Sequence, residues 1–404
     1  MSRQPLVRDL PFSKALKDRT AGNRKILRRD YLGAGVLPVV DQGASLIAGY
    51  TNDESAAYKG PLPVIIFGDH TRVLKYVDYP FAIGADGAKV LAPIGDFEPR
   101  YLYYYLLSRQ IPSRGYSRHF RLLRETSVRW VPRLEQRHIV GILDQANRLC
   151  DLRAKANAKA DRVLSALLVR LLGGPANWHR DPCCEPLGEL AIPVSGATPP
   201  KRVESFWQGS VPWVSPKDMK VEFLSDSQDH VSEAAIHETN LNLIERGNAL
   251  VVVRGMILAR SVPLAINLTP VTINQDLKAL VPRTEDVTGT YLWAALTAAK
   301  LQLKSLVRTA GHGTRKLDTP DLMEFRIPRP DPDQIREVSS VVETHRQLVQ
   351  RRRESERSLN RLFTLLSTKA FDGSLTASWR ETHAAVLLED SPDRHLADPM
   401  EGVA

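Results

Sequence analysis

Two long stretches of the chain repeat apolar residues at alternating steps of three and four positions. The first frame holds Ile139, Ile142, Ala146, Leu149, Arg153, Ala156, Ala160, Val163, Leu167 and Arg170. An offset of 196 residues gives the second frame, Ile335, Val338, Val342, His345, Val349, Arg352, Glu356, Leu359, Phe363 and Leu366. Eight and seven of the ten positions are apolar. An apolar period of 3.5 residues is typical of a coiled-coil seam, so we predict two helices of about 50 Å each.

Each predicted helix needs a partner because a narrow apolar seam cannot bury itself. We expect the two helices to pack against each other in antiparallel directions, which brings Arg153 close to Glu356. The competing interpretation is an ordinary packing of two helices inside a single domain.

The segments that lead into the two helices also resemble each other. GYSRHFRLLRETSVRWVPR spans residues 115–133, and GHGTRKLDTPDLMEFRIPR spans residues 311–329, again 196 residues later and without a gap. Glycine opens both segments and Pro-Arg closes both. The chain is therefore interpreted as a diverged internal duplication with the same turn-to-helix entrance in each half.

Short β-branched runs between Gly and Pro residues predict strands in both halves. The matching pairs are GVLPVV (35–40) with GSVPWV (209–214), VIIFGD (64–69) with VVVRGM (251–256), and AKVLAP (88–93) with LKALVP (277–282); YLYYYL (101–106) matches YLWAAL (291–296) as a short helix. We predict an α+β protein with a pseudo-twofold internal repeat, in which a pair of long antiparallel coiled-coil helices separates two mixed α/β domains. The expected parts are a first domain (1–132), a first long helix (133–173), a linker (174–186), a second domain (187–328), a second long helix (329–370) and a partly disordered tail (371–404).

Composition narrows the class of protein. A chain of 404 residues with 43% apolar and 25% charged residues is typical of a globular protein with two domains. No apolar run is long enough for a membrane helix, and the first residues lack the apolar core of a secretory signal. Cys150, Cys183 and Cys184 lack C-x-x-C spacing, so we expect a cytoplasmic protein without a disulfide framework.

Positive charge is concentrated in the body of the chain. The net charge is +9, but residues 381–404 alone carry −5, which leaves +14 for the rest. Such an excess favours a polyanionic partner, most simply nucleic acid, and the spacing of the two domains makes double-stranded DNA the expected form. Two unlike basic domains on a rigid helical spacer would suit two half-sites about 34–36 Å apart, one turn of B-DNA.

Cations near the predicted turns are the candidate DNA contacts, because such side chains bind phosphates and base edges. The candidates are Arg72, Lys75, Arg114, Arg118, His119 and Arg121 in the first half, and Lys201, Arg202, Lys217, Lys220, Arg254, Arg260, His312, Arg315 and Lys316 in the second. Gly115 and Gly311 precede cation-rich turns and would let the backbone approach a phosphate. The alternative for each single cation is solvated surface. LVQRRRESER (348–357) is interpreted as a solvated or subunit-docking helix face.

The order of several phrases along the chain resembles the specificity subunit of type I restriction–modification systems. The phrases are PVVDQGASLIAGYTN (38–52), VIIFGDHTRVLKYVD (64–78), PFAIGADGAKVLAP (80–93), GYSRHF (115–120), VPRLEQRHIVGILD (131–144), ATPPKRVESFWQGSVPWVSPKDM (197–219), INQDLKALVP (273–282), IPRPDPDQIREV (327–338) and FDGSLTASWR (371–380). One departure is Pro332, which stands where the first copy has Gln136. Proline is tolerated in the first turn of a helix.

The resemblance implies two target-recognition domains, each reading one half of a bipartite asymmetric DNA sequence, and two spacer helices that fix the gap. It also implies that these helices dock two adenine-specific methyltransferase subunits, to which restriction (motor–nuclease) subunits add. S-adenosylmethionine, ATP and magnesium would then belong to the partner subunits, with no cofactor in this chain.

Catalytic signatures are weak. The sequence has no Asn/Asp-Pro-Pro-aromatic methyltransferase loop and no G-x-x-x-x-G-K-[ST] phosphate loop. His179 with the two neighbouring cysteines is interpreted as a linker rather than a metal site, and Asp69–His70 as a turn rather than a catalytic dyad. We therefore predict a non-catalytic DNA-reading subunit. The alternatives are a protein-interaction scaffold with two end domains, and a reader for a methyltransferase-only or other multisubunit nuclease system.

Overall fold

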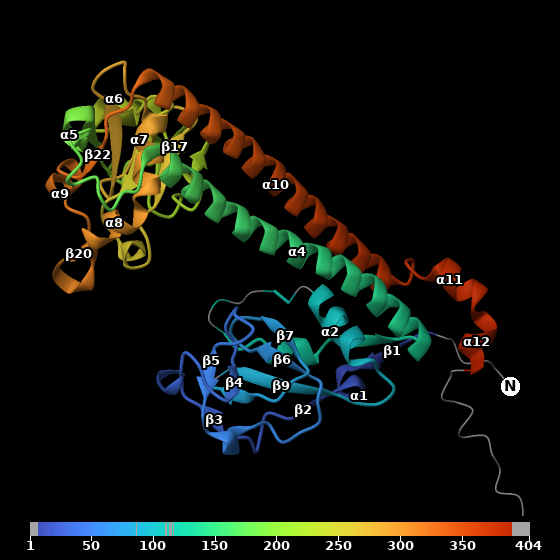
Figure 1. Cartoon of the computed structure of the whole chain (residues 1–404). Helices are drawn as coiled ribbons and strands as arrows, with labels where there is room; N and C mark the ends of the chain where they lie inside the picture. Colours follow the sequence, from blue (N-terminus) through green and yellow to red (C-terminus); the bar gives the residue numbers. More distant parts are fainter. Residues whose placement is uncertain (1–6, 86, 110, 113–114, 116, 390–404) are drawn as a thin grey trace, which may run out of the picture. The chain divides into compact units, whose positions relative to one another are not determined.

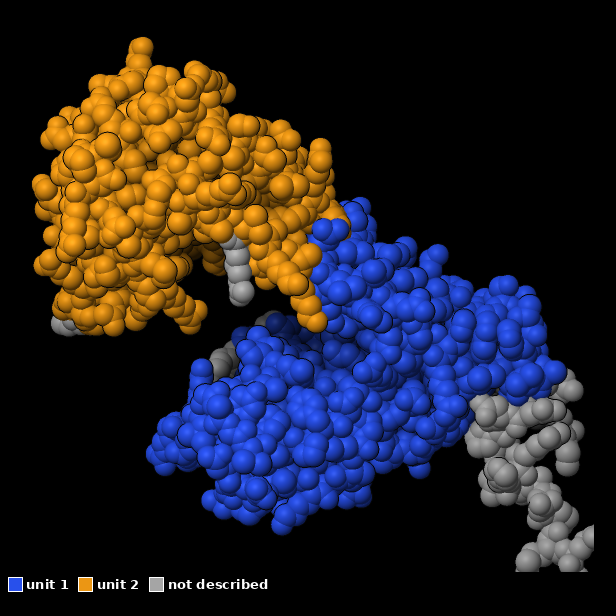
Figure 2. Space-filling view, viewed as in Figure 1, with its two compact units in different colours: residues 1–153, 356–404 blue, residues 154–355 orange. Residues whose placement is uncertain are grey.

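The computed structural model describes residues 7–85, 87–109, 111–112, 115 and 117–389. The chain divides into two compact units (Figure 2), one formed by residues 1–153 and 356–404 and the other by residues 154–355. Both units contain strands and helices (Figure 1), which confirms the predicted mixed α/β class. Among the described residues, no helix combines the length and the apolar character needed to cross a bilayer.

The first unit contains two four-stranded sheets and a two-stranded ladder. The sheets have the orders β2-β9-β6-β7 and β3-β8-β4-β5, and the ladder pairs β1 with β10. The strands are β1 (Arg8–Pro11), β2 (Leu16–Asp18), β3 (Lys25–Ile26), β4 (Leu37–Val40), β5 (Gly49–Thr51), β6 (Val64–Gly68), β7 (Leu74–Val77), β8 (Ala82–Gly84), β9 (Ala88–Pro93) and β10 (Ser127–Trp130). The short helices are α1 (Phe12–Ala15), α2 (Pro99–Ser108), α3 (Phe120–Arg124), α11 (Ala377–Thr382) and α12 (Ala384–Glu389).

Strand β6 is apolar throughout because both of its faces are covered. Ile65 and Phe67 pack in a core with the tyrosines of α2, whereas Val64 and Ile66 pack in a second core with β7 and β9. A strand buried on both faces shows a continuous apolar run instead of an alternating pattern. This explains the run VIIF in the sequence.

The second unit contains a five-stranded sheet, a three-stranded sheet and two ladders. The orders are β12-β19-β16-β17-β14, β15-β13-β18, β11-β22 and β20-β21. The strands are β11 (Cys184–Pro186), β12 (Ala191–Ser195), β13 (Val211–Val214), β14 (Phe223–Leu224), β15 (Asp229–Val231), β16 (Ala249–Val252), β17 (Leu264–Asn267), β18 (Thr272–Ile273), β19 (Leu277–Pro282), β20 (Arg308–Thr309), β21 (Arg315–Lys316) and β22 (Arg326–Pro328). The short helices are α5 (Leu187–Leu190), α6 (Glu233–Glu238), α7 (Gly289–Ala298), α8 (Lys300–Ser305) and α9 (Thr319–Met323).

The two units repeat the same strand pairings. In the first, β4 pairs antiparallel with β5 and parallel with β8. In the second, β13 pairs antiparallel with β15 and parallel with β18. The larger sheets agree as well, since β6 and β9 pair antiparallel in the same way as β16 and β19. The internal duplication inferred from the sequence therefore has a counterpart in the topology.

Two long helices run through both units, α4 (Arg133–Leu172) and α10 (Pro332–Asp372). In the first unit, the start of α4 shares a core with the end of α10, through Ile139 and Leu143 with Leu366 and Ala370. In the second unit, the end of α4 shares a core with the start of α10. Within each unit the two helices therefore run side by side in opposite directions (Figure 1).

The predicted seam describes α10 better than α4. In α4, the seam positions Leu149, Val163 and Leu167 are 50%, 55% and 41% exposed. Leu164 and Leu168, each one residue after a seam position, are instead buried in the core of the second unit. An α-helix has 3.6 residues per turn, so the buried face drifts away from a strict 3.5-residue frame over several turns. The prediction of a single continuous seam along α4 was wrong for this reason.

The contact expected between Arg153 and Glu356 stays a prediction. In the second unit, Arg352 Nη1 of α10 donates a hydrogen bond to the carbonyl O of Asn157 in α4 at 3.1 Å.

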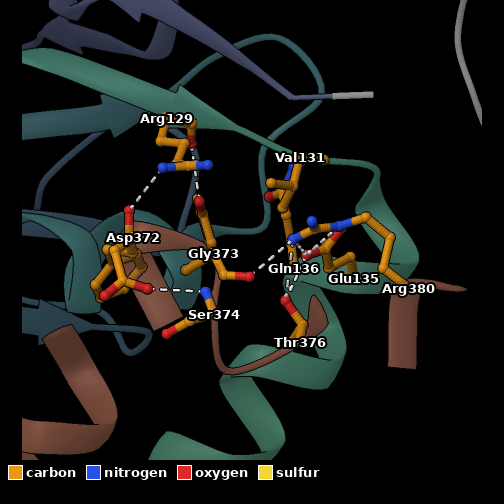
Figure 3. A network of polar contacts seen from close by, with 11 residues as sticks. Arg129, Val131, Glu135, Gln136, Asp372, Gly373, Ser374, Thr376 and Arg380 are labelled. Atoms are coloured by element: carbon orange, nitrogen blue, oxygen red, sulfur yellow. Dashed lines mark hydrogen bonds and ion pairs between the residues drawn. The ribbon is translucent and has the colours of Figure 1, made fainter. Parts of the chain in front are cut away.

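The segment after α10 is fixed to the start of α4 by a buried polar network (Figure 3). Arg380 Nη2 donates to Glu135 Oε1 at 2.6 Å, and Thr376 Oγ1 donates to the same oxygen at 2.6 Å. The side chains of Glu135 and Thr376 are fully buried. The hydrogen bond to Glu135 raises the pKa of Arg380 above its ordinary value. Part of the predicted tail is thus an ordered component of the first unit, while residues 390–404 lie outside the described residues.

The second helix entrance lacks this network. Asp331 takes the place of Glu135, and its Oδ1 accepts a hydrogen bond from Gln334 N at 2.8 Å, which caps the start of α10. Gln136 is buried and bonds to the carbonyl O of Val131 at 2.8 Å, whereas its counterpart Pro332 opens α10. The replacement of Gln136 by Pro332 in the second copy therefore corresponds to a different hydrogen-bonding pattern at the start of the second long helix.

Candidate nucleic-acid interface

In the first unit, the turn between β6 and β7 is hydrogen-bonded to the segment that follows Gly115 and to Ile111 before it. The carbonyl O of Asp69 accepts a hydrogen bond from His119 N at 2.9 Å, and Asp69 Oδ1 accepts one from Phe120 N at 2.8 Å. Arg72 adds a bond from its Nη1 to the carbonyl O of Ile111 at 2.8 Å. The β6–β7 turn and the segment around residues 111–121 therefore form one surface, which we call the first basic surface.

Three of the predicted cations are exposed on the first basic surface, namely Arg72, Arg118 and Arg121. Arg121 forms an exposed ion pair with Glu125 at 3.1 Å, and exposed pairs of this kind contribute little to stability. Gly115 has a φ of 68°, a conformation that favours glycine. Arg114 lies outside the described residues.

Lys75 and His119 are not available for DNA contact. The Lys75 side chain is 4% exposed and donates from Nζ to the carbonyl O of Asp41 at 2.7 Å. Burial lowers the pKa of Lys75, although the negative charge of Asp41 opposes the shift. His119 is fully buried, and its Nδ1 lies 3.0 Å from the carbonyl O of Asp69. Both residues stabilise the domain from inside, so we no longer count them among the candidate contacts.

In the second unit, the segment after β16 binds the β20–β21 hairpin in an equivalent way. Gly255 N donates to the carbonyl O of Arg315 at 3.0 Å, and Arg254 forms an antiparallel bridge with Lys316. Residues far apart in the sequence, 254–260 and 308–316, therefore lie together as the second basic surface. In the turn of this hairpin Gly313 has the left-handed conformation, with a φ of 76°. The approach of a phosphate to the backbone at Gly311 stays a prediction.

The predicted cations of the second basic surface differ in their availability. Arg254 and Arg260 are exposed, and neither forms an ion pair with any other described residue. Arg315 is half-buried and bonds to Thr309 Oγ1, and Lys316 pairs with Asp318. The side chain of His312 lies outside the described residues.

The remaining four predicted cations lie on two other loops of the second unit. Lys201, Arg202, Lys217 and Lys220 are all exposed. Lys217 Nζ forms an ion pair with Asp229 Oδ2 at 2.6 Å. Lys201 and Asp229 also line a cavity of about 430 Å³, together with Glu204, Trp207, Gln208 and Trp213. These cations extend the polar surface of the second unit beyond the hairpin.

Two glutamines beside these surfaces, Gln42 and Gln275, were not among the predicted contacts. Both stand in polar triplets that directly follow an apolar strand, Asp41-Gln42-Gly43 after β4 and Asn274-Gln275-Asp276 after β18. That position at the end of a buried strand was the available signal. The search for cations alone passed over it.

The candidate catalytic and metal groups have structural roles or no partners of the right kind. Asp69 Oδ1 is bonded to a backbone amide, as described above. Burial raises the pKa of the Cys184 thiol to about 11, so this cysteine stays protonated at neutral pH. Within the described part of the chain, no three His, Cys, Asp or Glu side chains are grouped as a metal site requires.

The comparisons with known proteins point to one family. Residues 185–350 match the family described as "Type I restriction modification DNA specificity domain". The chain is 28% identical over 353 residues to the Escherichia coli type I restriction enzyme EcoR124I/EcoR124II specificity subunit, covering 83% of this chain and 84% of that protein. It is 26% identical over 180 residues to the type I restriction enzyme MjaIX specificity subunit of Methanocaldococcus jannaschii, covering 44% and 40% of the two chains.

Solved structures agree at the level of the fold. The type I restriction–modification S subunit from M. genitalium matches with a TM-score of 0.50 at 15% identity, over 90% of this chain and 96% of that one. A chain from a structural study of assembly and conformational transition of a type I system matches with a TM-score of 0.50 at 18% identity, over 84% and 92%.

Proposed function

We propose that this chain is a specificity subunit of a type I restriction–modification system, which reads a bipartite, asymmetric DNA target and has no catalytic role of its own. The matched family and the similar Escherichia coli subunit support this proposal. The observation that carries the proposal is the repeated construction of a basic surface. In each unit a strand end binds a distant cation-bearing segment that leads into a long helix. Arg72, Arg118, Arg254 and Arg260 are the exposed cations best suited to phosphates.

The asymmetry of the target follows from differences between the two units. At equivalent positions of the small sheets, the half-buried Gly49 of β5 in the first unit corresponds to the half-buried Asp229 of β15 in the second, so the partly exposed strands differ in charge. Two domains of one fold with unlike surface chemistry would recognise unlike half-sites, because base edges are distinguished by their donors, acceptors and methyl groups.

We further propose that α4 and α10 form one antiparallel coiled coil that separates the two target-recognition domains. The antiparallel packing inside each unit supports this, as does the length of about 60 Å expected for helices of 40 and 41 residues. Such a strut would fix the number of base pairs between the two half-sites.

The same helices are proposed to dock two methyltransferase subunits, to which restriction subunits add. Several apolar side chains on them are exposed, namely Leu149, Leu152, Val163, Leu167, Leu348, Leu362 and Leu365. A groove of about 330 Å³ lies between the helices in the second unit, lined by Val163, Leu167, Val341 and Leu348. Exposed apolar patches on a soluble surface mark protein-binding sites. S-adenosylmethionine, ATP and magnesium would be held by these partners, and the three free cysteines fit a cytosolic location.

Exchange of residues 187–325 for those of a relative with another target tests the proposal. The exchanged chain, produced in cells with its methyltransferase subunit, is expected to change one half of the methylated motif and to leave the other half intact. Sequencing of modified adenines in the genome measures both halves. An unaltered motif would contradict the assignment of this region to target recognition.

Salt dependence separates the proposal from the alternative of a protein-interaction scaffold. A reader with about six phosphate contacts loses roughly a thousandfold in DNA affinity between about 50 and 200 mM salt, because bound counterions are released. A scaffold would have no such affinity to lose. Titration of a labelled duplex with the purified complex at several salt concentrations distinguishes the two.

A further inference from the structure

Each unit places one glutamine amide at the turn between the small and the large sheet, from a neighbouring loop in the first unit and from the turn itself in the second. In the first unit, Gln42 lies against the turn from β8 to β9. A Cβ atom at Gly87 of this turn would lie 2.5 Å from Gln42 Oε1, and Gly87 has a φ of 86°. The positive φ favours glycine at position 87, and the Gln42 amide occupies the space beside it.

The orientation of the Gln42 amide is fixed by its neighbours. His70 N donates to Gln42 Oε1 at 3.2 Å, and Thr71 Oγ1 donates to the backbone O of Gln42 at 2.5 Å. A backbone N–H can only donate, so the amide oxygen must face His70. The NH₂ group of this half-buried side chain therefore points away from His70 and offers two N–H donors to a ligand.

In the second unit, Gln275 stands at the apex of the equivalent turn from β18 to β19. The neighbouring Asn274 stabilises this turn and is only 6% exposed. Its Oδ1 accepts a hydrogen bond from Asp276 N at 3.0 Å, and its Nδ2 donates one to Asp276 Oδ2 at 3.2 Å. Gln275 itself is exposed, and its Oε1 accepts from Thr198 Oγ1 at 2.6 Å. The amide oxygen of Gln275 is thus hydrogen-bonded within the protein, as in Gln42, and its NH₂ group supplies the donors.

A second glycine permits this arrangement. A Cβ atom at Gly196 would lie 1.9 Å from the carbonyl O of Ile273. The absence of a side chain lets the segment with Thr198 pack directly against the turn, and Ala197 N donates to that carbonyl at 3.0 Å.

Each glutamine adjoins the basic surface of its own unit. Gln42 is bonded to His70 and Thr71, which directly precede the exposed Arg72. The turn of Gln275 is bonded to the exposed Arg254, whose backbone N donates to the carbonyl O of Asp276 at 3.2 Å. The two amides therefore stand beside the cations that carry the proposed function.

Two features favour phosphate over base as the ligand. Bidentate recognition of adenine uses both the oxygen and the nitrogen of a glutamine amide, and here the oxygen is engaged by the protein. In addition, both domains carry a glutamine amide with an engaged oxygen at the turn between the small and the large sheet, although Gln42 comes from the loop after β4 and Gln275 from the turn itself. An amide donor at this place in two domains that are proposed to read different half-sites suits a group common to every DNA sequence. We propose that Gln42 and Gln275 bind backbone phosphates as amide donors and fix the position of each domain on the duplex without reading bases. This inference rests on the proposed function.

Alanine and glutamate variants of both glutamines test the inference. In the complex with the methyltransferase subunit, Gln42→Ala and Gln275→Ala are each expected to lower the affinity for a duplex with the methylated motif and for an unrelated duplex alike, by about tenfold. Gln42→Glu and Gln275→Glu should lose more, because a carboxylate repels the phosphate. The slope of affinity against salt should not change in the alanine variants, since no cation is removed.

Two controls make the result specific. Asn177→Ala changes an exposed amide in the linker before β11 and should leave DNA affinity unaltered, and Arg254→Ala should reduce the salt slope. The inference is overturned if an alanine variant relaxes one position of the methylated motif, which would make that glutamine a base reader, or if its affinity equals that of Asn177→Ala. Absence of DNA binding by the unaltered complex would refute the proposed function itself, and the inference with it.

Discussion

At the scale of single residues, the carboxylate of Glu135 has no contact with solvent, and Arg380 balances its charge from the segment after α10. Removal of one partner of a buried pair leaves the other charge uncompensated, which costs about 3 kcal/mol or more. We therefore expect Arg380→Ala to lower the free energy of unfolding by about 3 kcal/mol, with Arg380→Lys intermediate because lysine keeps the charge but loses the bidentate geometry. Urea unfolding of the full chain measures the loss.

The matched control for Arg380 is Arg357→Ala, which removes an exposed arginine of the same unit. It should cost less than about 0.5 kcal/mol. Hydrogen exchange adds a local readout, because residues 373–389 should exchange faster in Arg380→Ala. Equal stability of the two variants would show that the buried pair does not hold this segment.

Single residues were also where the sequence misled most. In LKYV of β7 the alternating pattern favours outward cations, yet Lys75 points inward because Asp41 offers it a carbonyl and a carboxylate. Asp41 belongs to a loop more than thirty positions earlier, so the pairing could not be inferred from local pattern. His119 is buried for a similar reason, since its backbone and ring are bonded to the carbonyl of Asp69.

At the scale of elements, the sequence predicted more. The apolar runs at 64–69 and 88–93 correspond to β6 and β9, and the predicted helices over 133–173 and 329–370 correspond to α4 and α10. Long periodic segments and apolar runs between Gly and Pro are determined locally, so pattern is enough to find them. Which face of α4 is buried depends instead on the domains against which the helix packs. The spacing of apolar residues alone does not determine that face.

His345 joins α10 to the core of the second unit through Glu222. His345 Nε2 lies 2.7 Å from Glu222 Oε2, and the histidine ring packs against Phe223 with centroids 5.9 Å apart. Burial alone would raise the pKa of Glu222, but the hydrogen bond and charge of His345, with the charges of Lys300 and Arg352, bring it below its ordinary value of 4.5. A carboxylate with a depressed pKa contributes stability above its unfolded pKa and loses it as the pH falls through the folded value.

The pH dependence of a Glu222→Gln variant tests this contact. At neutral pH the variant should be less stable than the unaltered chain by about 2 kcal/mol, the usual contribution of a hydrogen bond to a charged group. The difference should narrow as the pH falls below about 4.5 and through the lowered pKa at which Glu222 becomes protonated in the unaltered chain. Thermal unfolding of both chains at neutral and at acidic pH measures this difference in stability. A difference that is constant with pH would mean that the charge of Glu222 plays no part.

At the scale of the whole molecule, the proposed coiled coil makes the length of the helices a determinant of the target. Arg352 donates to the carbonyl O of Asn157, so these positions of α10 and α4 lie opposite one another. Four residues inserted after Asn157 alone would shift the partners on one side of this contact by about 6 Å and break the antiparallel register. We expect that variant to lose methylation.

A second insertion of four residues, before Arg352 in α10, should restore the register. The strut would then be longer by about 6 Å, close to two base-pair steps of about 3.4 Å. We expect the doubly inserted chain to methylate both original half-sites with a gap that is about two base pairs longer. Sequencing of modified adenines reads the gap directly. Because neither domain is altered, a change within a half-site, or an unchanged gap in the single insertion, would mean that something other than the paired helices sets the distance.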